Sequence, residues 1–152
     1  MLDAGRLGGL RFAAGLPPPV LAELAALAVP RTFGPRAIIF REGTACEEVY
    51  LVESGHVALD MNVPGRGLIR ILTVGEGELL GWSALLGDGV MTATATALEE
   101  TKLVVLPGAA LRDLCQRNHE IGFRIMQQVA RALSQRLVAT RLQLLDLFAD
   151  NK

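Results

Sequence analysis

The residues whose types and spacing could do chemistry lie in one stretch, 75–97, which reads GEGELLGWSALLGDGVMTATATA. Its glycines at 75, 77 and 81 permit backbone angles that are closed to other residues and let a ligand approach the main chain. Residues 82–86 predict one helical turn whose free N–H groups point back at the loop, and this geometry suits an anion such as a phosphate. Residues 92–96 alternate Thr and Ala, which predicts a strand with hydroxyls on one face. The stretch is therefore typical of a cradle for a small ligand.

This stretch resembles the phosphate-binding cassette of the cyclic-nucleotide-binding domains of the catabolite-activator (Crp-Fnr) type. That cassette runs Gly-Glu-hydrophobic-small-hydrophobic, a short loop, and then Arg-Ser/Thr-Ala. The resemblance puts Gly81 on the family's glycine, residues 83–86 on its short helix and Thr92-Ala93 on its closing pair. The candidate ligand-binding residues that it implies are Gly81, Trp82, Ser83, Ala84, Met91, Thr92 and Ala93.

The cassette is non-standard at its two most diagnostic positions. Trp82 stands where the family has the Glu that binds the ribose 2′-hydroxyl, and Met91 stands where it has the Arg that grips the cyclic phosphate. The stretch 75–97 contains no Lys or Arg but three acidic residues, Glu76, Glu78 and Asp88. We therefore predict weak or no binding of cyclic AMP and cyclic GMP. The indole of Trp82 could stack on another small effector or fold inward and fill the pocket, whereas Arg131 or Arg136 of a second copy could restore anion binding.

The elements that position the cassette are predicted by the turns around it. Short runs rich in Ile, Val and Thr between 32 and 106 are separated by Gly- and Pro-containing turns, which indicates an antiparallel sheet rolled into a barrel or jelly roll. A short packing helix precedes these runs and stops at Pro30. The family resemblance spans about residues 16–148 and implies the same α+β fold, an antiparallel β-roll with flanking helices and a long C-terminal dimerisation helix. We expect one domain over 1–152, with the roll at about 32–106 and C-terminal helices at about 109–148.

The long helix predicted at 118–148 is the second informative feature. Asn118 is a good N-cap, and a helix of this length would extend about 45 Å, which is longer than one small β domain can cover. Residues 121, 125 and 129 are expected to pack on the chain's own roll. An a/d pattern at spacings of four and three runs through Met126, Ala130, Leu133, Leu137, Thr140, Leu144 and Leu147. The sequence therefore predicts a homodimer through residues 118–148, as the family resemblance also implies.

Composition narrows the remaining classes of partner. The chain has 152 residues, a hydrophobic share of 51% and a formal net charge of −1, so no global field attracts nucleic acid. The arginines at 117, 124 and 131 form one stripe that reads as a solvated helix face. No helix-turn-helix follows the long helix, so we expect no sequence-specific DNA binding by this chain alone, although a protein partner is possible. The sequence has neither a signal peptide nor an apolar run of about 20 residues, and we expect a cytoplasmic protein without a membrane partner.

Catalysis finds little support in the sequence. His56 and His119 lie in different predicted elements, and neither belongs to a metal-binding motif. We predict no catalytic residue, no metal site and no certain cofactor beyond a cyclic nucleotide or another small effector. Three hypotheses follow: a small-molecule sensor, a degenerate module that serves dimerisation or partner docking with an empty or self-filled pocket, and a cupin-like metal enzyme.

Overall fold

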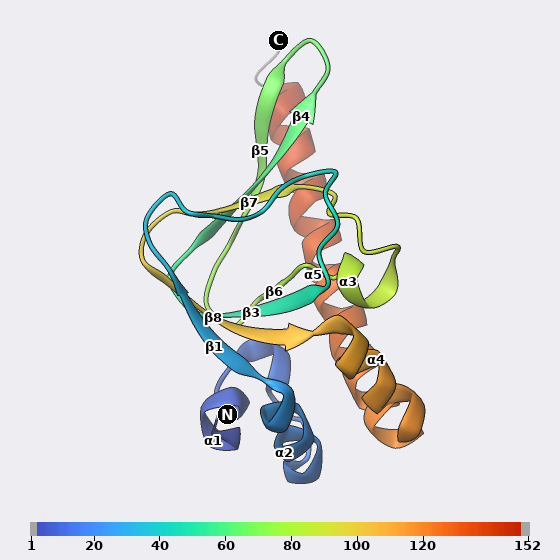
Figure 1. Ribbon diagram of the computed structural model, residues 1–152. Helices are drawn as coiled ribbons and strands as arrows, with labels where there is room; N and C mark the ends of the chain where they lie inside the picture. Colours follow the sequence, from blue (N-terminus) through green and yellow to red (C-terminus); the bar gives the residue numbers. More distant parts are fainter. Residues whose placement is uncertain (1–2, 150–152) are drawn as a thin grey trace.

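The strands form two four-stranded antiparallel sheets that close into a roll, with helices from both ends of the chain packed against it (Figure 1). The computed structural model describes residues 3–149. One sheet has the order β1-β8-β3-β6 and the other the order β2-β7-β4-β5. The strands are β1 (Val29–Phe33), β2 (Ile38–Phe40), β3 (Glu48–Ser54), β4 (Val57–Val63), β5 (Gly67–Val74), β6 (Leu79–Leu80), β7 (Thr94–Ala97) and β8 (Thr101–Pro107). The β-roll predicted from the sequence is confirmed.

The roll begins slightly earlier than the sequence predicted. The helix α2 (Pro18–Leu27) ends before Pro30, as expected, but Pro30 then lies inside β1 and pairs with Val104 of β8. Proline has no N–H to give to a sheet, and it is tolerated here because β1 is the edge strand of its sheet.

Two short N-terminal helical segments were not predicted. They are α1 (Ala4–Gly8) and the 3₁₀ turn η1 (Arg11–Ala13). Glycines make this stretch a poor helix former, but the Asp3 carboxylate accepts the Gly5 N–H at 3.3 Å, and Arg6 of α1 pairs with Glu53 of β3. Local capping and a tertiary ion pair therefore hold α1 where propensity alone would not.

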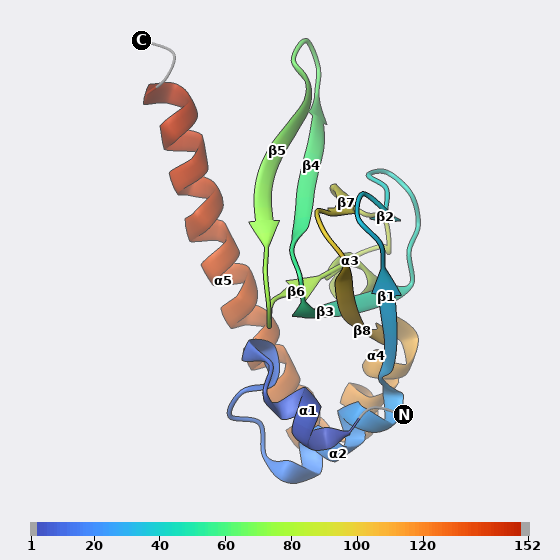
Figure 2. The ribbon, with the colours of Figure 1, turned by 90° about the vertical axis from the view of Figure 1, so that its left-hand side faces the viewer.

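The C-terminal helices are α4 (Gly108–Arg117) and α5 (His119–Ala149). The side chain of Asn118 accepts the Ile121 N–H at 3.2 Å, which confirms it as the cap that starts α5. Ile121, Ile125 and Val129 are buried in the core, as predicted. Figure 2 shows the C-terminal half of α5 running on past this packed region, beside the β4–β5 hairpin, with no other helix against it.

Two glycines shape the loops next to the cassette. Gly77 and Gly81 have φ of +83° and +75°, angles that favour glycine, whereas Gly75 does not use such an angle. A methyl group on Gly77 would lie 2.6 Å from the backbone nitrogen of Arg11, and one on Gly81 would lie 2.9 Å from the carbonyl oxygen of Glu48. The chain passes so closely at both places that only glycine fits.

We expect Gly77→Ala to destabilise the fold far more than Gly65→Ala. Both glycines have nearly the same positive φ, +83° and +82°, but nothing lies within 4 Å of the methyl group that Gly65→Ala adds. Gly65→Ala should therefore cost about 1–2 kcal/mol for the backbone angle alone, and Gly77→Ala should cost at least about 2 kcal/mol more because it collides with backbone. Denaturant midpoints of the two variants measure the difference. Equal losses would contradict a rigid contact between the loop and η1.

Candidate functional site

The predicted cassette residues come together around one small cavity. Six of the seven border it, and the seventh, Ala84, is buried in the core instead. Trp82 follows Gly81 as the N-cap of the short helix α3 (Ser83–Leu86), and β7 begins just after Ala93. Other walls of this cassette cavity are Phe40, Leu59, Leu80 and Arg136.

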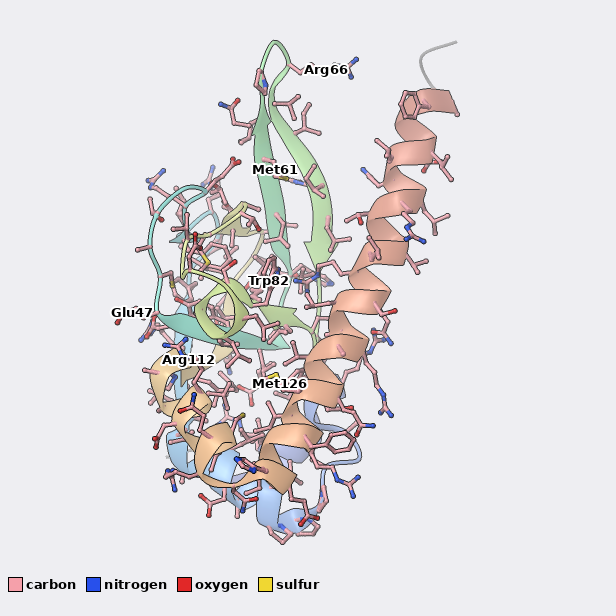
Figure 3. All side chains as sticks on the ribbon, turned by 90° about the vertical axis from the view of Figure 1, so that its right-hand side faces the viewer. Glu47, Met61, Arg66, Trp82, Arg112 and Met126 are labelled. Carbon is pink, nitrogen blue, oxygen red and sulfur yellow. The ribbon has the colours of Figure 1, made fainter. Side chains whose placement is uncertain are left out.

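The cassette cavity is nearly filled by the chain's own side chains. Its volume is about 30 Å³, whereas pockets for drug-sized ligands are about 300–1,000 Å³. Met91 is only 2% exposed and belongs to the core, and Trp82 is half-buried against it. Figure 3 shows Trp82 beside α3, on the side toward α5. This space is of the order of a water molecule or two and is too small for a nucleotide.

Backbone donors around the cavity are fewer than the sequence suggested. At the start of α3, the Ala84 N–H donates to the Gly81 carbonyl at 3.0 Å, and the Leu85 N–H donates to the Trp82 carbonyl at 2.9 Å. The Met91 N–H donates to the carbonyl of Thr44 at 2.9 Å. We predicted from the sequence that N–H groups here would be free to bind an anion. These three already donate to backbone carbonyls, two of them within the helical turn and one in the loop that carries Thr44.

Arg136 brings a positive charge to the cavity from the same chain. It lies on α5, and one of its Nη groups donates to the backbone carbonyl of Leu79. Its Nε is buried and has no acceptor among residues 3–149. Burial lowers the pKa of the Arg136 guanidinium, and the nearby Glu78 carboxylate opposes part of this shift. From the sequence we expected Arg136 to reach the cassette only from a second copy. In the structure, Arg136 of the same chain borders the cassette cavity.

A polar cluster supports the cassette loop from behind. The ring of Tyr50 lies against Gly81, and its hydroxyl donates to Glu48 Oε1 at 2.9 Å. Arg31 donates to both carboxylate oxygens of Glu48, at 2.9 and 3.0 Å. These bonds from Arg31 are the main reason that the pKa of Glu48 lies below its ordinary value, and burial raises the pKa of Tyr50. Because these three side chains use their hydrogen-bonding groups on one another, we assign them a structural role behind the cassette loop.

The two histidines lie apart, as the sequence suggested. His56 Nδ1 lies 2.5 Å from Glu99 Oε1, and His119 begins α5. Within residues 3–149, no group of three or more His, Cys, Asp or Glu side chains is placed to hold a metal ion. The cupin-like hypothesis has no candidate ligand set in this part of the chain. None of the described helices is long and apolar enough to cross a membrane.

Comparisons with known proteins agree with this fold. The family model described as "Cyclic nucleotide-binding domain" matches residues 30–118. A crystal structure of a putative cyclic nucleotide-binding protein from Geobacter metallireducens is similar with a TM-score of 0.80 and 28% identity, over 90% of this chain and 99% of that one. The CRP-like cAMP-activated global transcriptional regulator of Mycobacterium tuberculosis is 29% identical over 88% of this chain and 58% of the regulator.

An enzyme is also among the relatives. Lysophospholipase nte1 of Neurospora crassa is 31% identical over 61% of this chain, but the matched segment is only 6% of that enzyme. The chain therefore spans only part of the length of the curated relatives it matches.

Proposed function

Since the chain belongs to the cyclic nucleotide-binding domain family, we propose that it is a regulatory module whose own cassette is closed to cyclic AMP and cyclic GMP. The observation that carries this proposal is the cassette cavity of about 30 Å³, occupied by Met91 and walled by Trp82. Of the three functions predicted from the sequence, the closed cavity favours the degenerate, self-filled module over the small-molecule sensor.

The chemistry of the cassette supports the same proposal. An arginine fork on a phosphate supplies two charge-assisted hydrogen bonds of about 1.5–3 kcal/mol each. Met91 supplies none, so the loss in affinity is on the order of a hundredfold or more. Arg136 does not replace the fork, because one of its Nη groups already donates to the backbone carbonyl of Leu79.

We further propose that the module works as a homodimer through α5. Its C-terminal half exposes large apolar side chains that nothing in the described chain covers. They are Leu137, Val138, Leu142, Leu144, Leu145 and Phe148. A second copy is the favoured occupant because Leu137 and Leu144 continue the a/d spacing that suits pairing of identical helices. Of the rest of the predicted seam, Met126 and Leu133 pack partly on the chain's own core, and the Leu147 side chain lies outside the described part.

We do not propose that the arginines of the C-terminal helices recognise a DNA sequence. The predicted stripe of arginines is interrupted, because Arg117 ends α4, where it pairs with Asp113 at 2.7 Å, and only Arg124 and Arg131 of the stripe lie on α5, both exposed. These positions suit weak phosphate contact, but they provide no element that reads base edges in a groove. A cytoplasmic location and the action of residues 1–152 as one domain stay predictions from the sequence.

Titration calorimetry with cyclic AMP and cyclic GMP tests the closed cassette. We expect no saturable heat from either nucleotide at concentrations where an intact cassette would be filled, because neither room nor the fork is present. Thermal unfolding of the same sample checks that the protein is folded. A dissociation constant on the order of 1 μM for either nucleotide would refute the proposal.

A further inference from the structure

A second cavity lies outside the cassette, where η1, the loop between β5 and β6, and α5 meet. Its volume is about 220 Å³. The amide of Gln128 on α5 donates to the carbonyl oxygens of Phe12 and Ala14, at 2.6 and 3.1 Å, and the Phe12 N–H donates to the carbonyl of Gly77 at 3.0 Å. Direct hydrogen bonds therefore hold the three walls together, so the cavity is built into the fold.

Positive charge dominates the walls of this cavity. Arg11 comes from η1, and Arg131 and Arg136 come from α5. None of the three forms an ion pair among residues 3–149. Glu78 is the acidic residue at the wall, and its carboxylate accepts the Gly75 N–H at 3.1 Å. Three arginines and one glutamate therefore line the cavity, and this excess of positive charge attracts anions.

The donors at the cavity are also incompletely used. Arg131 donates through Nη1 to Gln128 Oε1 at 3.0 Å, and its other N–H groups have no acceptor in the described chain. Arg136, which borders both cavities, buries its Nε without an acceptor among residues 3–149. A buried charged donor without a partner is unfavourable, and an acceptor supplied by a ligand would remove that cost. The larger cavity is the one with room for such a ligand.

From the charge, the free donors and the volume, we propose that this cavity binds a small oxyanion that carries at least two negative charges. Guanidinium forks match carboxylates and phosphates alike. A volume below the usual range of about 300–1,000 Å³ favours a ligand smaller than a nucleotide. With Leu137 and Leu144 at a positions, Arg131 falls at b and Gln128 at f, away from the seam. The site therefore stays open in the proposed dimer.

The test uses inorganic phosphate, pyrophosphate, succinate and citrate as probes, each compared with sodium chloride at matched ionic strength. We expect at least one probe to raise the melting temperature and to bind saturably in calorimetry. Arg11→Gln and Arg131→Gln should each weaken that binding about tenfold or more. Arg124→Gln, an arginine from the same helix stripe that does not border the cavity, should bind as the unchanged protein does.

The outcomes separate the ligand classes and the two proposals. Binding of the phosphates alone assigns a phosphoryl ligand, and binding of succinate or citrate alone assigns a carboxylate. Arg11 is exposed and donates to no described residue, so Arg11→Gln reports on the ligand even if Arg131→Gln disturbs Gln128. No saturable binding of any probe up to about 10 mM, or equal affinity in both variants and the control, would overturn the inference. Neither result bears on the closed cassette, which cyclic nucleotides test separately.

Discussion

Replacing Leu137 and Leu144 with glutamate should convert the protein from a dimer to a monomer. Leu137 is 51% exposed and Leu144 is 54% exposed in the isolated chain, and both lie on the part of α5 that continues past the packed region of the roll. Burying such a leucine contributes about 1.5–3 kcal/mol, and a two-fold seam buries each residue twice. The variant also places four like charges in the seam, so association should be lost. Light scattering over a range of concentrations measures the change.

The control for this experiment lies one residue further along the same helix. Val138 and Leu145 are also seven residues apart and are equally apolar, with exposures of 52% and 63%. If Leu137 and Leu144 occupy a positions, Val138 and Leu145 occupy b positions, which lie outside the seam. Val138→Glu with Leu145→Glu should therefore keep the dimer. If the control variant is a monomer and the first variant a dimer, the interface lies on the face of α5 that carries Val138 and Leu145. If both variants keep the mass of the dimer, α5 is not the interface.

Much of the fold could be predicted because its determinants are local in the sequence. Asn118 caps the helix that follows it, and the alternating Thr and Ala residues form β7 next to the loop that they close. The N-terminal helices could not be predicted, because α1 depends on an ion pair between Arg6 and Glu53, which come together only in the finished fold. The sequence predicts a helix stop at Pro30, and α2 does end before it, but the place of Pro30 in an edge strand depends on the order of the sheet.

The candidate site, like the fold, could be predicted from the sequence only in part. That Trp82 and Met91 cannot do the work of Glu and Arg follows from their chemistry, and their gathering around one cavity agrees with the cassette frame. Arg136 of the same chain was missed, although it lies seven residues after Val129 and so on the face of α5 that packs on the roll, because from the sequence we expected it only from a second copy. Likewise, a spacing of seven predicts one solvated stripe of Arg117, Arg124 and Arg131, but Arg117 ends α4, and the packing of η1 against α5 separates Arg131 from Arg124.

The frame of the cassette is intact enough to test by restoring its chemistry. Gly81 keeps the positive φ that lets the loop pass Glu48, α3 keeps its single turn, and Thr92 and Ala93 border the cavity. We expect Trp82→Glu with Met91→Arg to bind cyclic AMP or cyclic GMP at least about a hundredfold more tightly than the unchanged protein. The gain comes from removing the indole and adding one fork of charge-assisted hydrogen bonds. Calorimetry of both proteins measures it.

The stability of this double variant gives a second readout. Met91 is almost fully buried and Trp82 is half-buried, so the two charges that the variant adds must be taken out of water, and the empty variant should melt below the unchanged protein. A cyclic nucleotide should raise its melting temperature, because it binds only the folded state. Trp82→Gln with Met91→Gln is the matched control, since it also removes the indole but adds no charge. Tight binding by the control would mean that room alone limits the cassette. A folded double variant that binds neither nucleotide would mean that the frame is closed by more than these two side chains, with Arg136 on α5 as the next residue to replace.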